Sequence, residues 1–98
     1  MMRSRWTADA KDDLAKIKTF IADDSRENAK RFIQRIRAAV KAIRFPEAGS
    51  RILQFDKADL REIYVGNYRV VYRVVKSEIW VYRVIHGARR LPDSLGQL

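Results

Sequence analysis

The sequence contains no cysteine, and this absence removes several classes of function at once. Without thiols the chain has no disulfide framework, no thiolate nucleophile and no cysteine ligand for a metal. His86 is the single histidine, so a zinc site lacks its usual residues, and we expect neither a metal nor any other cofactor. No apolar run approaches the roughly 18–20 residues that span a bilayer, and the first residues lack the apolar core of a secretory signal. We therefore expect a cytoplasmic protein without a membrane partner.

Acidic residues are few compared with basic ones. The 98 residues include 21 Lys and Arg against 12 Asp and Glu, and the net charge of +9 predicts attraction to an anionic partner. Residues 25–44 and residues 60–90 carry seven basic residues each, with one acid in the first stretch and two in the second. Charge concentrated on two elements indicates a binding surface for nucleic acid, a ribosome or an acidic protein. A merely soluble basic protein is the plainer alternative.

The first half of the chain predicts two amphipathic helices after a brief strand at residues 3–6. The first helix begins at the N-cap Thr7 and ends near Ala22. The second begins at Asp24, where Glu27 completes a capping box, and Pro46 ends it. The apolar stripes of the two helices are Ala10, Leu14, Ile17 and Ile21, then Ala29, Phe32, Ile33, Ile36, Val40 and Ile43. Because the connection is short, we expect an antiparallel helical hairpin.

Residues 60–90 organise the second half of the chain. Three runs rich in Val, Ile and Tyr are separated by Gly66-Asn67 and by Lys76-Ser77, which predicts a three-stranded antiparallel meander. Residues 51–55 suit a short strand, residues 56–59 a turn, and residues 91–98 an irregular tail. The predicted fold is a single α+β domain of two layers in the order βααβββ, with the helical hairpin on one face of a small antiparallel sheet.

Two-residue turns would fix which strand residues share a face. They place Val65 opposite Tyr68, Arg73 opposite Trp80, and Arg69 opposite Val84. The face predicted to be buried under the helices collects Ile63, Val65, Tyr68, Val70, Tyr72, Val74, Ile79, Val81 and Ile85, interrupted by Arg61 and Arg83. The other face collects Glu62, Tyr64, Arg69, Val71, Arg73, Trp80, Tyr82, Val84 and His86.

This second face mixes arginine with aromatic residues, which is unusual for a sheet. Guanidinium groups could hold phosphates while rings stack on bases, and Arg73 could stack on Trp80. The same face could accept a peptide or helix of a partner protein. It could also be covered by the tail of the chain itself.

Three blocks of the sequence resemble the RelE/ParE-type toxins of bacterial toxin–antitoxin modules. The blocks are Trp6-Thr7 with Ala10–Leu14 and Ile17, then Leu60–Ile63 with Val65–Val74, and finally Val84–Arg90. They occur in order over nearly the whole chain. The resemblance implies the fold predicted above and a growth-inhibiting toxin that a cognate antitoxin protein neutralises.

The resemblance implies one of two activities. RelE-like members cut mRNA in the ribosomal A site by 2′-OH attack without a metal, using basic residues and often a C-terminal tyrosine, whereas ParE-like members block DNA gyrase. For a nuclease, Arg69 and Arg89 match the basic positions, and Arg61 falls near a third. Leu95 stands where the tyrosine is expected and cannot transfer a proton, so His86 or Tyr64 would have to act as acid or base.

We favour the gyrase-directed branch, because the general acid/base is missing and the ending Ile85–Arg89 resembles that branch. On this interpretation the chain has no catalytic residues and is not an enzyme. The alternatives are a ribosome-dependent mRNA endoribonuclease and a small basic domain that binds bare DNA or RNA. The residues predicted to bind the target or partner are Tyr64, Arg69, Arg73, Trp80, Tyr82, His86, Arg89 and Arg90.

Overall fold

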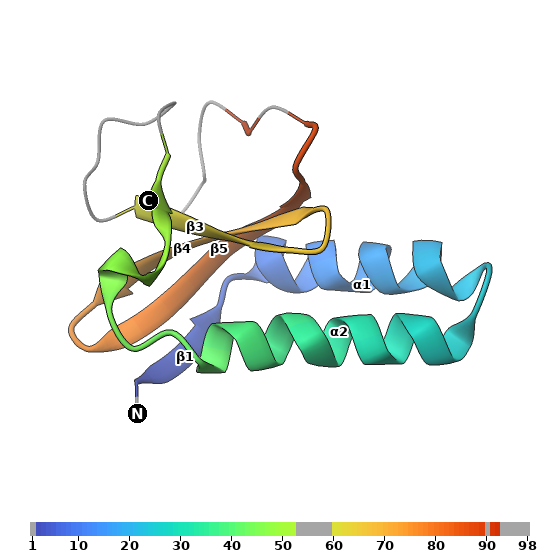
Figure 1. Ribbon diagram of the computed structural model, residues 1–98, viewed down its shortest axis with the longest axis horizontal. Coiled ribbons are helices and arrows are strands. Elements are labelled where there is room, and N and C mark those ends of the chain that lie inside the picture. Colours follow the sequence, from blue (N-terminus) through green and yellow to red (C-terminus); the bar gives the residue numbers. More distant parts are fainter. Residues whose placement is uncertain (1, 53–59, 90, 93–98) are drawn as a thin grey trace.

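The computed structural model describes residues 2–52, 60–89 and 91–92, and it consists of a helical layer packed on a sheet (Figure 1). The helical layer is the antiparallel pair α1 (Ala8–Ala22) and α2 (Arg26–Lys41). The sheet contains β1 (Arg3–Trp6), β2 (Ser50–Arg51), β3 (Leu60–Val65), β4 (Tyr68–Val75) and β5 (Glu78–His86), and a 3₁₀ turn, η1 (Pro46–Ala48), precedes β2. The predicted α+β class, element order and helical hairpin are confirmed. No helix in the described ranges has the length and apolar character needed to cross a membrane.

Helix α1 begins as predicted, because Thr7 acts as its N-cap. The Thr7 hydroxyl accepts a hydrogen bond from the Ala10 amide at 3.1 Å and donates one to the Tyr82 carbonyl at 3.0 Å. The Thr7 amide also donates to the carbonyl of Val81 at 3.0 Å. One buried side chain therefore caps the helix and fixes it to strand β5.

Helix α2 begins one residue later than predicted. Its N-cap is Ser25, which has extended backbone angles and accepts a hydrogen bond from the Asn28 amide at 3.2 Å. Asp24 instead lies in the turn, where its amide donates to the Ile21 carbonyl. The prediction of Asp24 was wrong because both residues are good caps, and only the path of the turn decides between them. The helix also ends at Lys41, before Pro46 could stop it.

The sheet has the strand order β1-β5-β4-β3-β2, so the meander β3-β4-β5 forms its centre. Strand β1 pairs with β5 in parallel, which makes the sheet mixed, and the two-residue β2 pairs with β3. Of the strand predicted at residues 51–55, the described part contains β2, Ser50–Arg51, and Ile52 lies beyond its end. Residues 53–59, which include the predicted turn, and residues 93–98 of the predicted tail lie outside the described residues.

Both predicted two-residue turns are present. Gly66 has a φ of 58°, and Lys76 and Ser77 have φ values of 50° and 65°. Positive φ at the centre matches the right-handed twist of the flanking strands. The turns fix Val65 opposite Tyr68 and Arg73 opposite Trp80, as predicted.

A β-bulge changes the predicted register in the second half of β5. Tyr72 pairs with Val81, but Val71 pairs with Arg83, so Tyr82 is an extra residue without an opposite partner. Arg69 therefore lies opposite Ile85 and not Val84. An extra residue moves every later side chain to the other face. The predicted faces of Val84 and Ile85 are consequently wrong.

The buried residues form two clusters on opposite faces of the sheet, and the bulge decides to which of them Val84 and Ile85 belong. The main core lies between the sheet and the helices and includes Val84, while Ile85 belongs to the second cluster. Members of the second cluster are Ile52, Leu60, Val71, Tyr82, Ile85 and Leu91, with Trp80 packed against them. Since Ile52 and Leu91 are 3% and 2% exposed, segments outside the meander cover part of this face.

Candidate functional site

A carboxylate–arginine pair joins helix α1 to the end of the sheet. Arg83 donates from Nε to Asp13 Oδ2 at 2.8 Å and from Nη2 to Oδ1 at 3.0 Å, and the Val84 amide donates to Oδ2 at 2.8 Å. The hydrogen bond to Asp13 raises the pKa of Arg83 above its ordinary value, so Arg83 keeps its positive charge. This bidentate pair fixes the distance between α1 and β5.

Beside this pair a cleft of about 240 Å³ opens between α1 and the end of β5, and we call it the α1–β5 cleft. It is lined by Asp13, Lys16, Ile17, Phe20, Tyr68, Arg83, Val84, Ile85, His86, Arg89 and Pro92. Phe20 is 73% exposed, a high value for an aromatic side chain. The cleft therefore presents exposed apolar surface next to basic groups, a combination that suits a protein partner.

His86 lies at this cleft because of the bulge. It stands opposite Tyr68, and the two rings meet edge to face with centroids 5.3 Å apart. The Ala88 amide donates to His86 Nδ1 at 3.2 Å, so the neutral ring carries its proton on Nε2. His86 thus lies away from the predicted aromatic face, on the side of the helices.

Arg69 is held by an acid of the neighbouring strand. Its Nε and Nη2 lie 2.8 and 2.7 Å from Glu62 Oε1, and the two side chains are only 14% and 11% exposed. A third bond runs from Nη1 to the Arg89 carbonyl at 3.4 Å. The guanidinium therefore fixes the segment that follows β5 to the sheet.

Gly87 brings this segment close to the β3–β4 turn. A Cβ on Gly87 would lie 3.0 Å from Tyr64 Cε2 and 3.2 Å from the Asn67 carbonyl oxygen, so a larger residue would force a shift. Tyr64 is 61% exposed and Arg89 is also exposed. The fold thus brings together four of the predicted site residues, Tyr64, Arg69, His86 and Arg89, at one end of the sheet.

The other predicted site residues are placed differently. Arg73 and Trp80 are half-buried and opposite each other, and the cation over the Trp80 ring, 5.8 Å from its centroid, is that of Arg5. Tyr82 is 6% exposed and belongs to the second cluster. Arg61 is half-buried, and its Nε has no hydrogen-bond partner among the described residues. Arg90 lies outside the described residues.

Among the cleft residues, His86 and Arg89 were the two predicted to bind a partner. The exposed or charged residues that were missed on α1 are Asp13, Lys16 and Phe20. Each lies on α1, whose mixed charge gave no reason to single it out. Phe20 carried a usable signal, because it lies beside the predicted apolar stripe and not within it. A large aromatic residue outside the stripe of an amphipathic helix indicates exposed apolar surface.

Comparison with known proteins relates this arrangement to a family. A solved structure titled "Chromosomal ParDE TA system from P. aeruginosa" shares the fold, with a TM-score of 0.69 and 23% sequence identity over 88% of this chain and 96% of that one. No curated protein sequence matches the chain significantly. The sequence model of the family described as "ParE toxin of type II toxin-antitoxin system, parDE" matches residues 4–91. The chain therefore belongs to the ParE toxin family of type II toxin–antitoxin systems.

Proposed function

We propose that this ParE-family toxin acts by binding and inhibiting DNA gyrase, and that a cognate antitoxin neutralises it. Membership of the family supports a role in a toxin–antitoxin pair. The choice of gyrase over mRNA as the target rests on the ion pair that Arg69 forms within the sheet. The net charge of +9 supports an antitoxin with an acidic binding segment.

The ion pair of Arg69 is the observation that carries this choice. Metal-free RNA cleavage needs a cation that can stabilise charge developing on the phosphate. Glu62 lies 2.7 Å from Arg69 in a largely enclosed position, so its carboxylate offsets the guanidinium charge and would repel an incoming phosphate. Arg69 is therefore better suited to holding the fold than to catalysis.

The α1–β5 cleft is the surface that we assign to the protein partners. Phe20 offers an apolar anchor, while Lys16 and Arg89 offer charge at the rim. Protein interfaces obtain most of their binding energy from a few buried aromatic or arginine anchors. The second sheet face is less suitable, since Val71 and Tyr82 are already buried there.

Two phenylalanines provide a matched test of this surface. Phe20 and Phe45 are 73% and 65% exposed, but Phe20 lies in α1 near the hairpin turn, and Phe45 follows the opposite end of α2 (Figure 1). We expect Phe20→Ala to weaken gyrase inhibition and antitoxin binding about tenfold or more, and Phe45→Ala to leave both nearly unchanged. Supercoiling assays and titration with the antitoxin would measure this. Equal effects of the two variants would contradict the assignment.

Ribosome-dependent mRNA cleavage is the second candidate, because His86 and Arg89 line the same cleft and could serve as acid/base and cation. It predicts A-site cuts that His86→Ala and Arg89→Ala abolish. Translation reactions containing the wild-type toxin would show such cuts by primer extension. Intact mRNA in the wild-type reaction rules this candidate out.

A further inference from the structure

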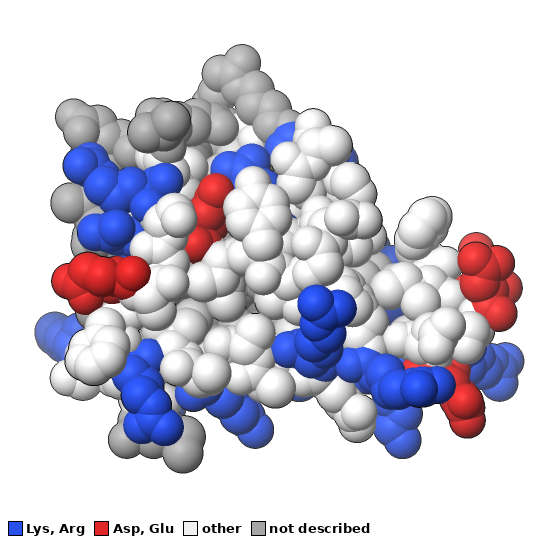
Figure 2. Space-filling model, viewed as in Figure 1, with Lys and Arg blue, Asp and Glu red and all other residues white. Residues whose placement is uncertain are grey.

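Helix α2 carries a row of basic side chains that is separate from the α1–β5 cleft. Arg26, Lys30, Arg37 and Lys41 are all exposed, and their spacings of four, seven and four residues place them on one side of the helix. We call these four residues the α2 basic stripe. In Figure 2 basic side chains follow the lower edge of the molecule, where α2 lies in Figure 1.

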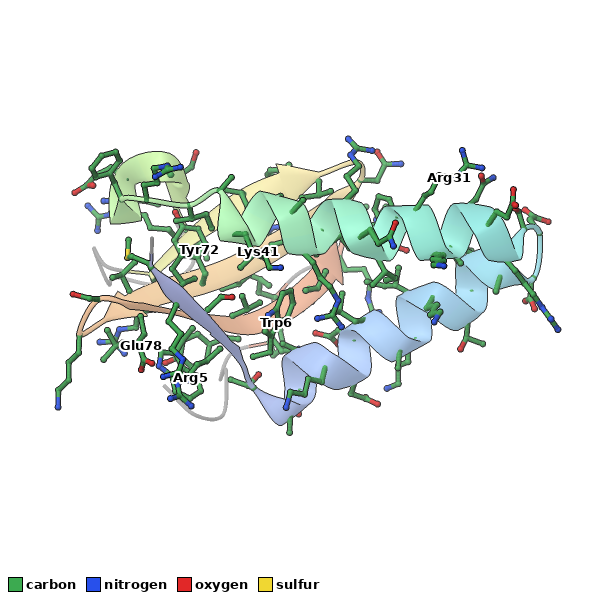
Figure 3. The ribbon with its side chains drawn as sticks, turned by 90° about the horizontal axis from the view of Figure 1, so that it is seen from below. Arg5, Trp6, Arg31, Lys41, Tyr72 and Glu78 are labelled. Atoms are coloured by element: carbon green, nitrogen blue, oxygen red, sulfur yellow. The ribbon has the colours of Figure 1, made fainter. Side chains whose placement is uncertain are left out.

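The charges of the stripe are largely uncompensated. Among the described residues, none forms an ion pair with Arg26, Lys30 or Lys41, while Glu27, the single acid of α2, pairs with Arg31 at 3.5 Å. The Arg37 guanidinium lies 5.8 Å from the centroid of the Trp6 ring, which leaves its positive charge in place. Figure 3 shows Lys41 and Arg31 along α2, with Trp6 beneath the helix.

The stripe lacks the apolar surface that a protein or membrane partner would need. Phe20, Phe45 and Tyr64 are the large hydrophobic residues exposed in the described part of the chain, and none belongs to α2. The apolar side of α2 is occupied, since Ile36 and Val40 are buried in the main core. A surface helix binds a membrane by inserting apolar side chains, and protein interfaces have apolar centres. Phosphate groups need only cations.

We propose that the α2 basic stripe binds the phosphate backbone of double-stranded DNA. The 16 residues from Arg26 to Lys41 are joined by 15 helical steps, which correspond to about 22 Å at about 1.5 Å per residue. A duplex carries one negative charge per about 1.7 Å of axis, so each cation of the stripe has phosphates within reach. The B-form major groove admits a helix, whereas the deep, narrow major groove of duplex RNA does not.

A pair of charge-matched double variants tests this assignment. Lys30→Gln with Lys41→Gln removes two charges from the stripe, and Lys11→Gln with Lys18→Gln removes two from the exposed surface of α1. Binding of each full-length protein to a 20-base-pair DNA duplex is measured by fluorescence anisotropy from about 50 to 200 mM salt. We expect the salt slope of log Kd to fall by about two in the stripe variant and to change little in the α1 variant.

Three results would overturn the proposal: no binding of the wild-type protein at low salt, equal weakening in both variants, or tighter binding to an RNA duplex of the same sequence. Circular dichroism melting checks that both variants remain folded. The DNA contact does not depend on gyrase as the target. Supercoiling inhibition, measured separately for Phe20→Ala and for the stripe variant, tests the gyrase proposal, whereas the anisotropy titration tests the DNA contact. Either proposal can therefore fail while the other stands.

Discussion

The basic side chains of the sheet and those of the α2 basic stripe differ in burial and in pairing. In the sheet, Arg69 and Arg83 have carboxylate partners at 2.7–2.8 Å and are 14% and 25% exposed. On α2, the stripe residues are exposed, and Arg26, Lys30 and Lys41 form no ion pair with described residues. Residues of the same charge therefore serve different purposes in the two regions. Arg69 and Arg83 hold elements together, while the stripe residues of the helix remain available to a ligand.

This difference explains how a protein of net charge +9 can carry arginine within its strands. A guanidinium that is half-enclosed is costly unless a carboxylate meets it with good geometry. Both arginines satisfy this condition through acids that lie far from them in sequence or on the neighbouring strand. Substitutions that remove one partner should consequently affect stability in the sheet and have little effect on α2.

The largest effect should follow from Asp13→Ala. The change removes three hydrogen bonds and leaves Arg83 without its carboxylate, so we expect the free energy of unfolding to fall by about 3 kcal/mol. Asp12→Ala, which removes only an exposed i,i+4 pair with Lys16, is the matched control and should cost less than about 0.5 kcal/mol. Urea unfolding would measure both. Similar losses in the two variants would contradict the claim that the partly buried pair stabilises the protein more than the exposed one.

A smaller loss should follow from Glu62→Gln, which leaves the Arg69 cation without its counter-charge. We expect about 1–2 kcal/mol, and we expect Glu62→Gln combined with Arg69→Met to recover part of the loss. The single variant also tests catalysis, because it removes the carboxylate charge that offsets the guanidinium. If Glu62→Gln produced mRNA cleavage that the wild-type protein lacks, Arg69 would be a catalytic cation suppressed by its partner.

Tyr72 extends the comparison to an uncharged group of the sheet. Burial raises the pKa of Tyr72 above its ordinary value of 10.0, although a hydrogen bond with the Gly49 backbone opposes the shift. The unfolded chain therefore releases this proton at a lower pH than the folded protein. Stability should be complete below about pH 10 and should decline as the pH rises toward the folded pKa.

Tyr72→Phe should flatten this alkaline decline, and Tyr64→Phe, at a position 61% exposed, should leave it unchanged. Denaturant unfolding between pH 8 and pH 11 is the measurement, with each variant compared with its own value at pH 8. A decline of the same steepness in Tyr72→Phe would assign it to other groups.

The smallest effect should come from the α2 basic stripe. Lys30→Gln with Lys41→Gln should change the free energy of unfolding by less than about 0.5 kcal/mol, because neither side chain has a partner among the described residues. Thermal unfolding would show this as a nearly constant melting temperature. A loss of 1 kcal/mol or more would mean that the stripe has a structural role.

Much of the fold could be predicted because local signals agree. The apolar stripes around Ile17 and Ile36, the cap at Thr7 and the two turns of the meander all indicate the same two-layer arrangement. The bulge at Tyr82 left no local signal, since an extra residue in an alternating apolar strand still reads as strand. The Tyr82 carbonyl at the bulge accepts a hydrogen bond from the Thr7 hydroxyl, a contact between residues 75 positions apart that the sequence of the strand does not indicate.

The candidate site was less predictable for the same reason. One unpredicted residue moved Val84 and His86 to the side of the helices and Ile85 to the second cluster. Counting charges in the sequence also could not identify the carboxylate partners of Arg69 and Arg83, because a count gives no distances between residues. The pairing of Tyr64 with Arg69 followed directly from the two-residue turn at Gly66, and the structure has this pairing.

Gyrase supercoiling measured beside ribosome-dependent translation, with the same purified toxin, distinguishes the two possible targets. We expect that the toxin blocks supercoiling or stabilises gyrase–DNA cleavage complexes, that ribosome-bound mRNA remains intact, and that the antitoxin reverses the inhibition. Unchanged supercoiling together with mRNA cut in the ribosomal A site would contradict this expectation.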